Sequence, residues 1–93
     1  MSYYVYIITN PGKTTLYTGV TNDLERRLAE HRANRGNNAS FAGKYYCYKL
    51  LYYEIVQNIH DAISRESEIK LMNHNTKVTL IQKENPKMDF IWF

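Results

Sequence analysis

Two short runs of β-branched and aromatic residues flank a turn near the start of the chain, and this pattern constrains the fold most strongly. Residues 3–8 (YYVYII) and 16–20 (LYTGV) have compositions typical of strands, and Pro11-Gly12 between them is typical of a turn. Neighbouring strands joined in this way pair as an antiparallel hairpin. We therefore expect the chain to begin with a hairpin.

The rest of the chain predicts one more strand and several helices. Helices are expected at about residues 24–32, 59–72 and 76–83. The last of them is stopped by Pro86, residues 46–54 read as a third strand, and residues 33–43 as an exposed loop. The order β-β-α-β-α-α predicts an α+β fold, in which helices flank a small three-stranded antiparallel sheet. We expect residues 1–93 to form a single domain, with the apolar residues 90–93 folded back onto it.

Composition narrows the classes of protein that this chain resembles. It has no apolar run near the roughly 20 residues of a membrane span and no signal-peptide pattern, so we expect a cytoplasmic protein with no membrane partner. The single Cys47 cannot form an internal disulfide or a cysteine-framed zinc site. The net charge of +3 favours an anionic partner such as nucleic acid.

The first predicted helix turns two basic side chains toward its apolar side. At 3.6 residues per turn, Arg27 and His31 share the side that carries Leu24 and Leu28. Arginine at such a position is costly unless an anion meets it, or unless the side chain extends along the edge of the core toward water. For a lone arginine the second explanation is the more common one.

The second predicted helix repeats the pattern with a carboxylate. Glu66 lies among the isoleucines of that helix, whereas Arg65 and Glu68 are expected to face water. An inward carboxylate is half of an ion pair or a metal ligand. Opposite charges turned inward by two helices predict one shared site, and a structural ion pair between Arg27 and Glu66 explains the pattern equally well.

At these positions the sequence resembles the GIY-YIG nuclease family. Tyr4-Val5-Tyr6 stands where the first tripeptide of the family belongs, and Tyr17-Thr18-Gly19 stands where the second belongs. The family's helical arginine and histidine, its metal-binding glutamate and its late asparagine fall on Arg27, His31, Glu66 and Asn85. The resemblance spans nearly the whole chain, which is similar to the small stand-alone bacterial subgroup of the family. Tyr4 departs from the glycine of the first tripeptide, and Val20 stands where some relatives place a lysine.

The resemblance implies a metal-dependent endonuclease or nickase that cleaves phosphodiester bonds in DNA, with structured or damaged DNA, as in repair or recombination, among its expected substrates. The catalytic residues would be Tyr6, Tyr17, Arg27, His31, Glu66 and Asn85. One divalent cation, Mg²⁺ or Mn²⁺, would be held by Glu66 and phosphate oxygens. Tyr17 is the candidate general base, with Tyr6 orienting water or phosphate. Arg27 would donate two hydrogen bonds to oxygens of the pentavalent phosphorus, and His31 would relay the proton or hydrogen-bond a phosphate.

Two other functions stay open at this point. The chain could be a non-catalytic nucleic-acid-binding module that retains the fold and a basic face, or a protein-interaction domain in which Arg27 and Glu66 only pair. Phosphate contacts are expected from Arg26, Arg32, Arg35 and Lys44, with weak and salt-dependent binding. The sequence does not predict an oligomeric state.

Overall fold

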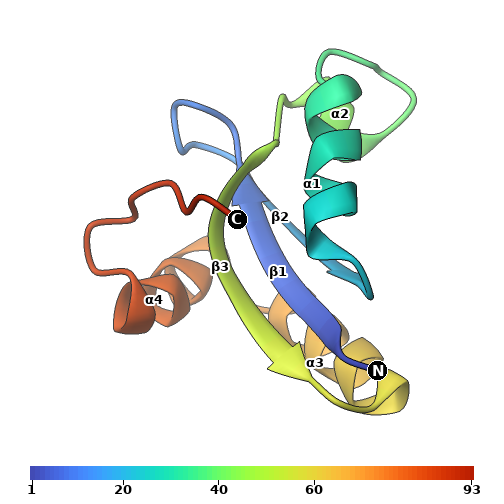
Figure 1. Ribbon diagram of the computed structural model, residues 1–93. Helices are drawn as coiled ribbons and strands as arrows, with labels where there is room; N and C mark the ends of the chain where they lie inside the picture. The colour runs from blue at the N-terminus through green and yellow to red at the C-terminus, as the bar shows by residue number, and fades with distance from the viewer.

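The computed structural model describes residues 1–93 and has the predicted α+β fold (Figure 1). The strands are β1 (Tyr3–Thr9), β2 (Leu16–Thr21) and β3 (Lys49–Val56). They form one antiparallel sheet in the order β2-β1-β3, so the predicted hairpin is confirmed. The helices are α1 (Leu24–Ala33), α2 (Phe41–Lys44), α3 (Ile59–Lys70) and α4 (His74–Glu84). None of these helices has the length and apolar character needed to cross a membrane.

Two features between α1 and β3 differ from the expectation. The stretch predicted as a loop ends in the short helix α2, which begins after Ser40 because that side chain accepts a hydrogen bond from the backbone N–H of Gly43. The third strand starts at Lys49 rather than Tyr46. Tyr46 has a positive φ of 58°, which no strand residue adopts, so the chain turns there before it enters the sheet.

The central strand β1 divides the core into two halves. Its alternating side chains point to opposite faces of the sheet, and both faces are covered. One core cluster, which contains Val5 and Ile7, packs against residues from α3 and α4. The other, which contains Tyr6 and Ile8, packs against Leu24 of α1. Tyr6 therefore belongs to the α1 side of the sheet, while α3 covers the opposite side (Figure 1).

The C-terminal segment returns to the sheet, as expected from its apolar sequence. The backbone N–H of Ile91 donates to the carbonyl oxygen of Leu50 at 2.8 Å, and the ring of Phe93 meets Tyr4 and Tyr53 edge-on. Trp92 departs from the expectation, because its side chain is 89% exposed. In Figure 1 the red end of the chain crosses β3.

Candidate active site

Tyr6 is the centre of the candidate site. Its side chain is 1% exposed, and its hydroxyl lies 2.8 Å from Nε2 of His31. Gly19 faces Tyr6 across the β1–β2 pair, and a Cβ atom at Gly19 would collide with the Tyr6 hydroxyl. Glycine is therefore required at this position, because the phenol ring of Tyr6 lies directly over the backbone of β2 there. This close approach explains the glycine of the Tyr17-Thr18-Gly19 tripeptide.

His31 sits on the inner side of α1 as predicted, and it is 5% exposed. Burial lowers the pKa of His31 to about 4, and the positive charge of Arg27 adds to this effect. The imidazole is therefore neutral near pH 7. Burial raises the pKa of Tyr6 far above its usual range, so Tyr6 remains a phenol. The Tyr6 hydroxyl consequently donates to Nε2, which assigns the proton of the neutral ring to Nδ1.

Arg27 reaches the same place from α1, one turn before His31. Its charge lowers the pKa of Tyr6, in opposition to the larger effect of burial, so the guanidinium lies near the phenol. Burial, the largest influence, lowers the pKa of Arg27, but the hydrogen bond to Glu30 and the effects of Tyr6 and Tyr17 together outweigh it and leave that pKa raised. The Arg27 side chain is 36% exposed, and its Nη1 lies 3.0 Å from Oε1 of Glu30. Arg27 thus partly follows the expected route along the core edge toward water.

Glu66 approaches Tyr6 from α3. Its side chain is only 17% exposed, and its charge is among the influences that raise the pKa of Tyr6. The cation paired with it is Lys70, one helical turn on, with Nζ 3.4 Å from Oε2. The structure contains no ion pair between Arg27 and Glu66, so the structural pairing considered from the sequence does not form.

Tyr17 completes the group of side chains around His31. The centroid of its ring lies 5.5 Å from that of the imidazole, in an edge-on arrangement. Tyr17 also influences Tyr6, because it is one of the groups that raise the Tyr6 pKa. The Tyr17 hydroxyl makes no hydrogen bond within the chain. Tyr6, Tyr17, Arg27, His31 and Glu66 therefore come together at the β2 side of the sheet, between α1 and α3.

Asn85 is placed elsewhere, at the end of α4. Its amide Nδ2 donates to the carbonyl oxygens of Leu51 and Asp89 at 3.0 and 2.8 Å, and its Oδ1 accepts from the backbone N–H of Asp89 at 3.1 Å. These bonds fasten the chain after α4 to β3. They link Asn85 to none of the five residues around Tyr6, and its catalytic role stays a prediction.

Arg65 corrects one expectation from the sequence. It was expected to face water, but its Nη2 lies 2.8 Å from Oε2 of Glu54 on β3, and Tyr52 donates a hydrogen bond to the same carboxylate. The Arg65 side chain is 28% exposed. Tyr52 and Glu54 are two residues apart on β3, so their side chains point to the same face of the sheet. Because Tyr52 is expected to face the core, this spacing could have predicted that Glu54 faces inward and needs a cation. The cluster joins α3 to β3.

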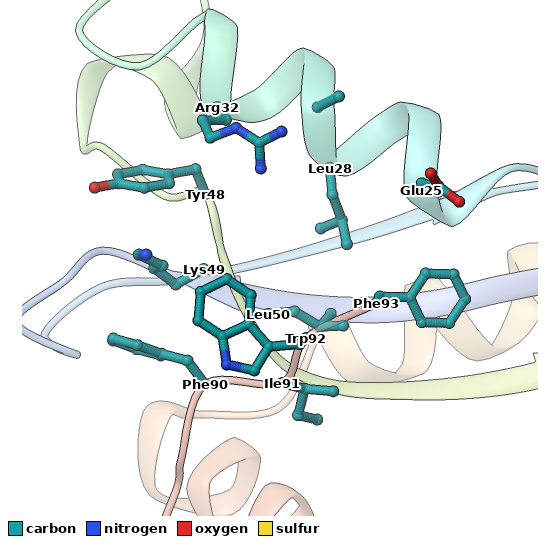
Figure 2. A pocket seen from close by; sticks show the side chains of 11 residues that line it. Glu25, Leu28, Arg32, Tyr48, Lys49, Leu50, Phe90, Ile91, Trp92 and Phe93 are labelled. Carbon is teal, nitrogen blue, oxygen red and sulfur yellow. The ribbon is translucent and has the colours of Figure 1, made fainter.

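The structure has a hollow that lies away from Tyr6 and the residues around it, on the other side of α1. It has a volume of about 240 Å³ and lies between α1, the start of β3 and the C-terminal segment (Figure 2). Its walls include Leu28, Arg32, Tyr48, Lys49, Phe90 and Trp92. None of the six site residues predicted from the sequence lines this hollow. Residues far apart along the chain create this hollow, so no local sequence pattern predicts it.

The metal-binding capacity of the candidate site rests on one residue. No group of three or more His, Cys, Asp and Glu side chains gathers anywhere in the chain to hold an ion. Glu66 alone offers a carboxylate near Tyr6. Mg²⁺ is commonly bound through one or two carboxylates together with substrate phosphates and water. The residues present therefore fit an ion whose coordination is completed by a substrate, and they do not form a closed cage.

Comparisons with known proteins test the family resemblance. The model of the GIY-YIG catalytic domain matches residues 2–86. The chain is 39% identical over 84 residues to a UPF0213 protein of Clostridium perfringens, covering 90% of this chain and 87% of that protein. A UPF0213 protein of Syntrophus aciditrophicus is 38% identical over 84 residues, covering 90% of this chain and 93% of that protein.

A solved structure supports the same assignment. The solution NMR structure of a UPF0213 protein from Bacillus halodurans superposes with a TM-score of 0.58 at 25% identity, covering 94% of this chain and 89% of that one. The family match and the relatives confirm the resemblance drawn from the tyrosine tripeptides. The chain belongs to the GIY-YIG nuclease family, within its group of small UPF0213 proteins.

Proposed function

We propose that this protein is a metal-dependent endonuclease or nickase that hydrolyses phosphodiester bonds in DNA, and that residues 1–93 act as one nuclease domain. The observation that supports this most is the convergence of Tyr6, Tyr17, Arg27, His31 and Glu66 on one place, although they come from four different elements. Arg27 and Glu66 do not pair with each other, and the partners they have, Glu30 and Lys70, are partly exposed residues of their own helices that a ligand can displace.

A proton path leads from the site surface to His31. A water molecule that donates to the Tyr6 oxygen could pass a proton to it, while the Tyr6 hydroxyl passes its own proton to Nε2 of His31, 2.8 Å away. The result is a hydroxide for attack on phosphorus and a short-lived imidazolium at His31, which readily gives its proton up again because burial lowers the pKa of the ring to about 4. This favours Tyr6 over Tyr17 as the group that takes the proton, since Tyr17 has no acceptor within the chain. Tyr17 is then left to orient the water or the phosphate.

Arg27 and Glu66 are suited to the phosphate itself. The guanidinium offers paired donors that match two phosphoryl oxygens, and its charge compensates the negative charge that develops on the pentavalent phosphorus. Glu66 would hold Mg²⁺ or Mn²⁺ together with phosphate oxygens. When bound, such an ion acts as a Lewis acid on the phosphate and stabilises the leaving oxygen.

The proposed substrate is DNA with a structured or damaged region, as arises in repair or recombination, and the proposed location is the cytoplasm.

Of the four expected phosphate contacts, Arg26 is already paired with Asp23 and Glu30. Arg32, Arg35 and Lys44 form no salt bridge and remain available for phosphates. With few free cations, binding should be weak and should fall steeply with salt.

Plasmid nicking tests the proposal. Supercoiled DNA is incubated with the purified protein in Mg²⁺, in Mn²⁺ and in EDTA, and conversion to the open-circular form is followed. Wild type should nick only with a divalent cation, and Glu66→Gln should lose this activity while keeping its circular dichroism spectrum. Glu84→Gln makes the same charge change at an exposed position of α4 and is the matched control. Equal nicking by wild type and Glu66→Gln would refute the proposal.

The non-catalytic binding module is the competing function. It predicts that the protein binds labelled DNA, that no cation produces cleavage, and that Glu66→Gln binds DNA as well as or better than wild type because a negative charge is removed. Binding without cleavage under all cation conditions would favour it.

A further inference from the structure

A row of aromatic rings leads out of the candidate site onto the surface. The ring of Tyr17 stacks on Phe41 of α2, with centroids 6.3 Å apart and planes inclined at 26°. Phe41 in turn contacts Tyr45, with centroids 4.8 Å apart. Despite these contacts, Phe41 is 52% exposed and Tyr45 is 43% exposed. Phe41 has no polar atom with which to face water, so its exposure calls for a ligand or a partner.

The backbone under these rings is firmly held. Ser40 caps the first turn of α2, and the carbonyl oxygen of Gly43 accepts from the backbone N–H of Gly36 at 2.8 Å. A Cβ atom at Gly43 would collide with the carbonyl oxygens of Asn34 and Asn37, so α2 lies directly against the preceding loop. The rings of Phe41 and Tyr45 are therefore presented on a fixed support.

The surroundings of the rings are positively charged. From residue 31 to residue 53 the chain contains no aspartate or glutamate, and the loop and short helix that carry the rings contain Arg35 and Lys44. The ammonium group of Lys44 lies 5.4 Å from the centroid of the Tyr45 ring. A surface that combines exposed flat rings with uncompensated positive charge matches a ligand with flat apolar groups on an anionic backbone, which describes a single nucleic-acid strand.

We propose that Phe41 and Tyr45, here called the aromatic platform, stack unpaired bases of the DNA strand whose phosphate lies at Tyr6 and Arg27. In a duplex the bases are stacked on one another and their faces are not accessible, so the platform selects DNA with unpaired nucleotides beside the bond to be cut. This inference rests on the proposed nuclease function, because the platform continues from Tyr17. Phe41 and Tyr45 would then influence which DNA is cut without taking part in the hydrolysis itself.

Binding without cleavage tests the platform. Fluorescence anisotropy in EDTA and low salt compares three labelled ligands: an oligothymidylate, a strand of equal length with abasic sites, and a duplex. Phe41→Ala should weaken binding of the oligothymidylate about tenfold, which is near the lower end of the usual contribution of one stacked base. The same variant should bind the abasic strand and the duplex as wild type does. Phe41→Trp keeps a flat ring and should bind the oligothymidylate with about the wild-type affinity.

Two controls separate stacking from other causes. Ile63→Ala removes a comparably exposed apolar side chain from α3 and should leave all three affinities unchanged. Equal weakening of the abasic strand and the oligothymidylate by Phe41→Ala would overturn the inference, because the effect would not involve bases. A change of oligomeric state in Phe41→Ala with unchanged DNA affinity would also overturn it, in favour of a protein interface.

The outcome is separable from that of the nicking assay. Cation-dependent nicking with no effect of Phe41→Ala on any ligand would leave the nuclease function standing and remove the platform. Base-dependent binding that is sensitive to Phe41→Ala, in a protein that never cleaves, would keep the platform and remove the nuclease function.

Discussion

Acidification should destabilise the wild-type protein through His31. The pKa of His31 falls from about 6.5 in an unfolded chain to about 4 in the folded protein, because the ring is buried beside Arg27. Between these two values the unfolded chain binds more protons than the folded one, so stability falls as the pH falls. From pH 7 to pH 5 this single group should remove about 2 kcal/mol from the free energy of unfolding, and about 3 kcal/mol over its whole range.

Urea denaturation followed by circular dichroism at pH 7 and pH 5 measures this loss. His31→Gln removes the titrating group but keeps a polar side chain of similar reach, so its stability should fall by about 2 kcal/mol less than that of wild type over the same interval. His60→Gln removes an exposed histidine of α3 and should retain the wild-type pH dependence. Equal pH dependence in wild type and His31→Gln would show that His31 is not held neutral by burial, and would refute the assignment of the Tyr6–His31 hydrogen bond.

Three further predictions follow from particular contacts. Gly19→Ala places a methyl group where the Tyr6 hydroxyl lies, so it should cost about 1–3 kcal/mol in urea denaturation and abolish nicking; wild-type behaviour would contradict the packing described. Asn85→Ala breaks its bonds to Leu51 and Asp89 and should lower stability by about 2 kcal/mol, and unchanged stability would contradict the fastening role described; nicking per folded molecule tests separately whether Asn85 is also catalytic. Lys44→Gln should reduce the slope of log affinity against log salt for single-stranded DNA by about 1, measured by anisotropy, and an unchanged slope would exclude a phosphate contact there.

Much of the fold could be predicted because local signals agreed with it. The hairpin followed from two β-branched runs around Pro11-Gly12, and α1 and α3 begin at the expected residues, where the side chains of Asp23 and Asn58 cap them. The start of β3 was misjudged because the tyrosines before it have high strand propensity. Tyr46, with its positive φ, directly follows the cap residue of α2, and its backbone N–H donates to the carbonyl oxygen of Gly43 at 3.2 Å; strand propensity does not report such a helix end.

The candidate site was only partly accessible from periodicity. The helical period placed His31 inward, and the structure confirms this, but it could not show that the imidazole meets Tyr6. The same reasoning wrongly predicted that Arg65 faces water, because the period of one helix does not show that Glu54 lies opposite it on β3. The aromatic platform had no periodic signal, since α2 is too short to produce one.

A double-mutant cycle in single-turnover DNA cleavage tests the central claim that Tyr6 and Arg27 serve one catalytic centre. Tyr6→Phe removes the proton path, and Arg27→Lys keeps the charge but loses the paired donors. Residues that act as a unit show strongly non-additive losses, so the double variant should be only slightly slower than the slower single variant. Cleavage losses that multiply in the double variant, or cleavage that neither substitution affects, would contradict the account.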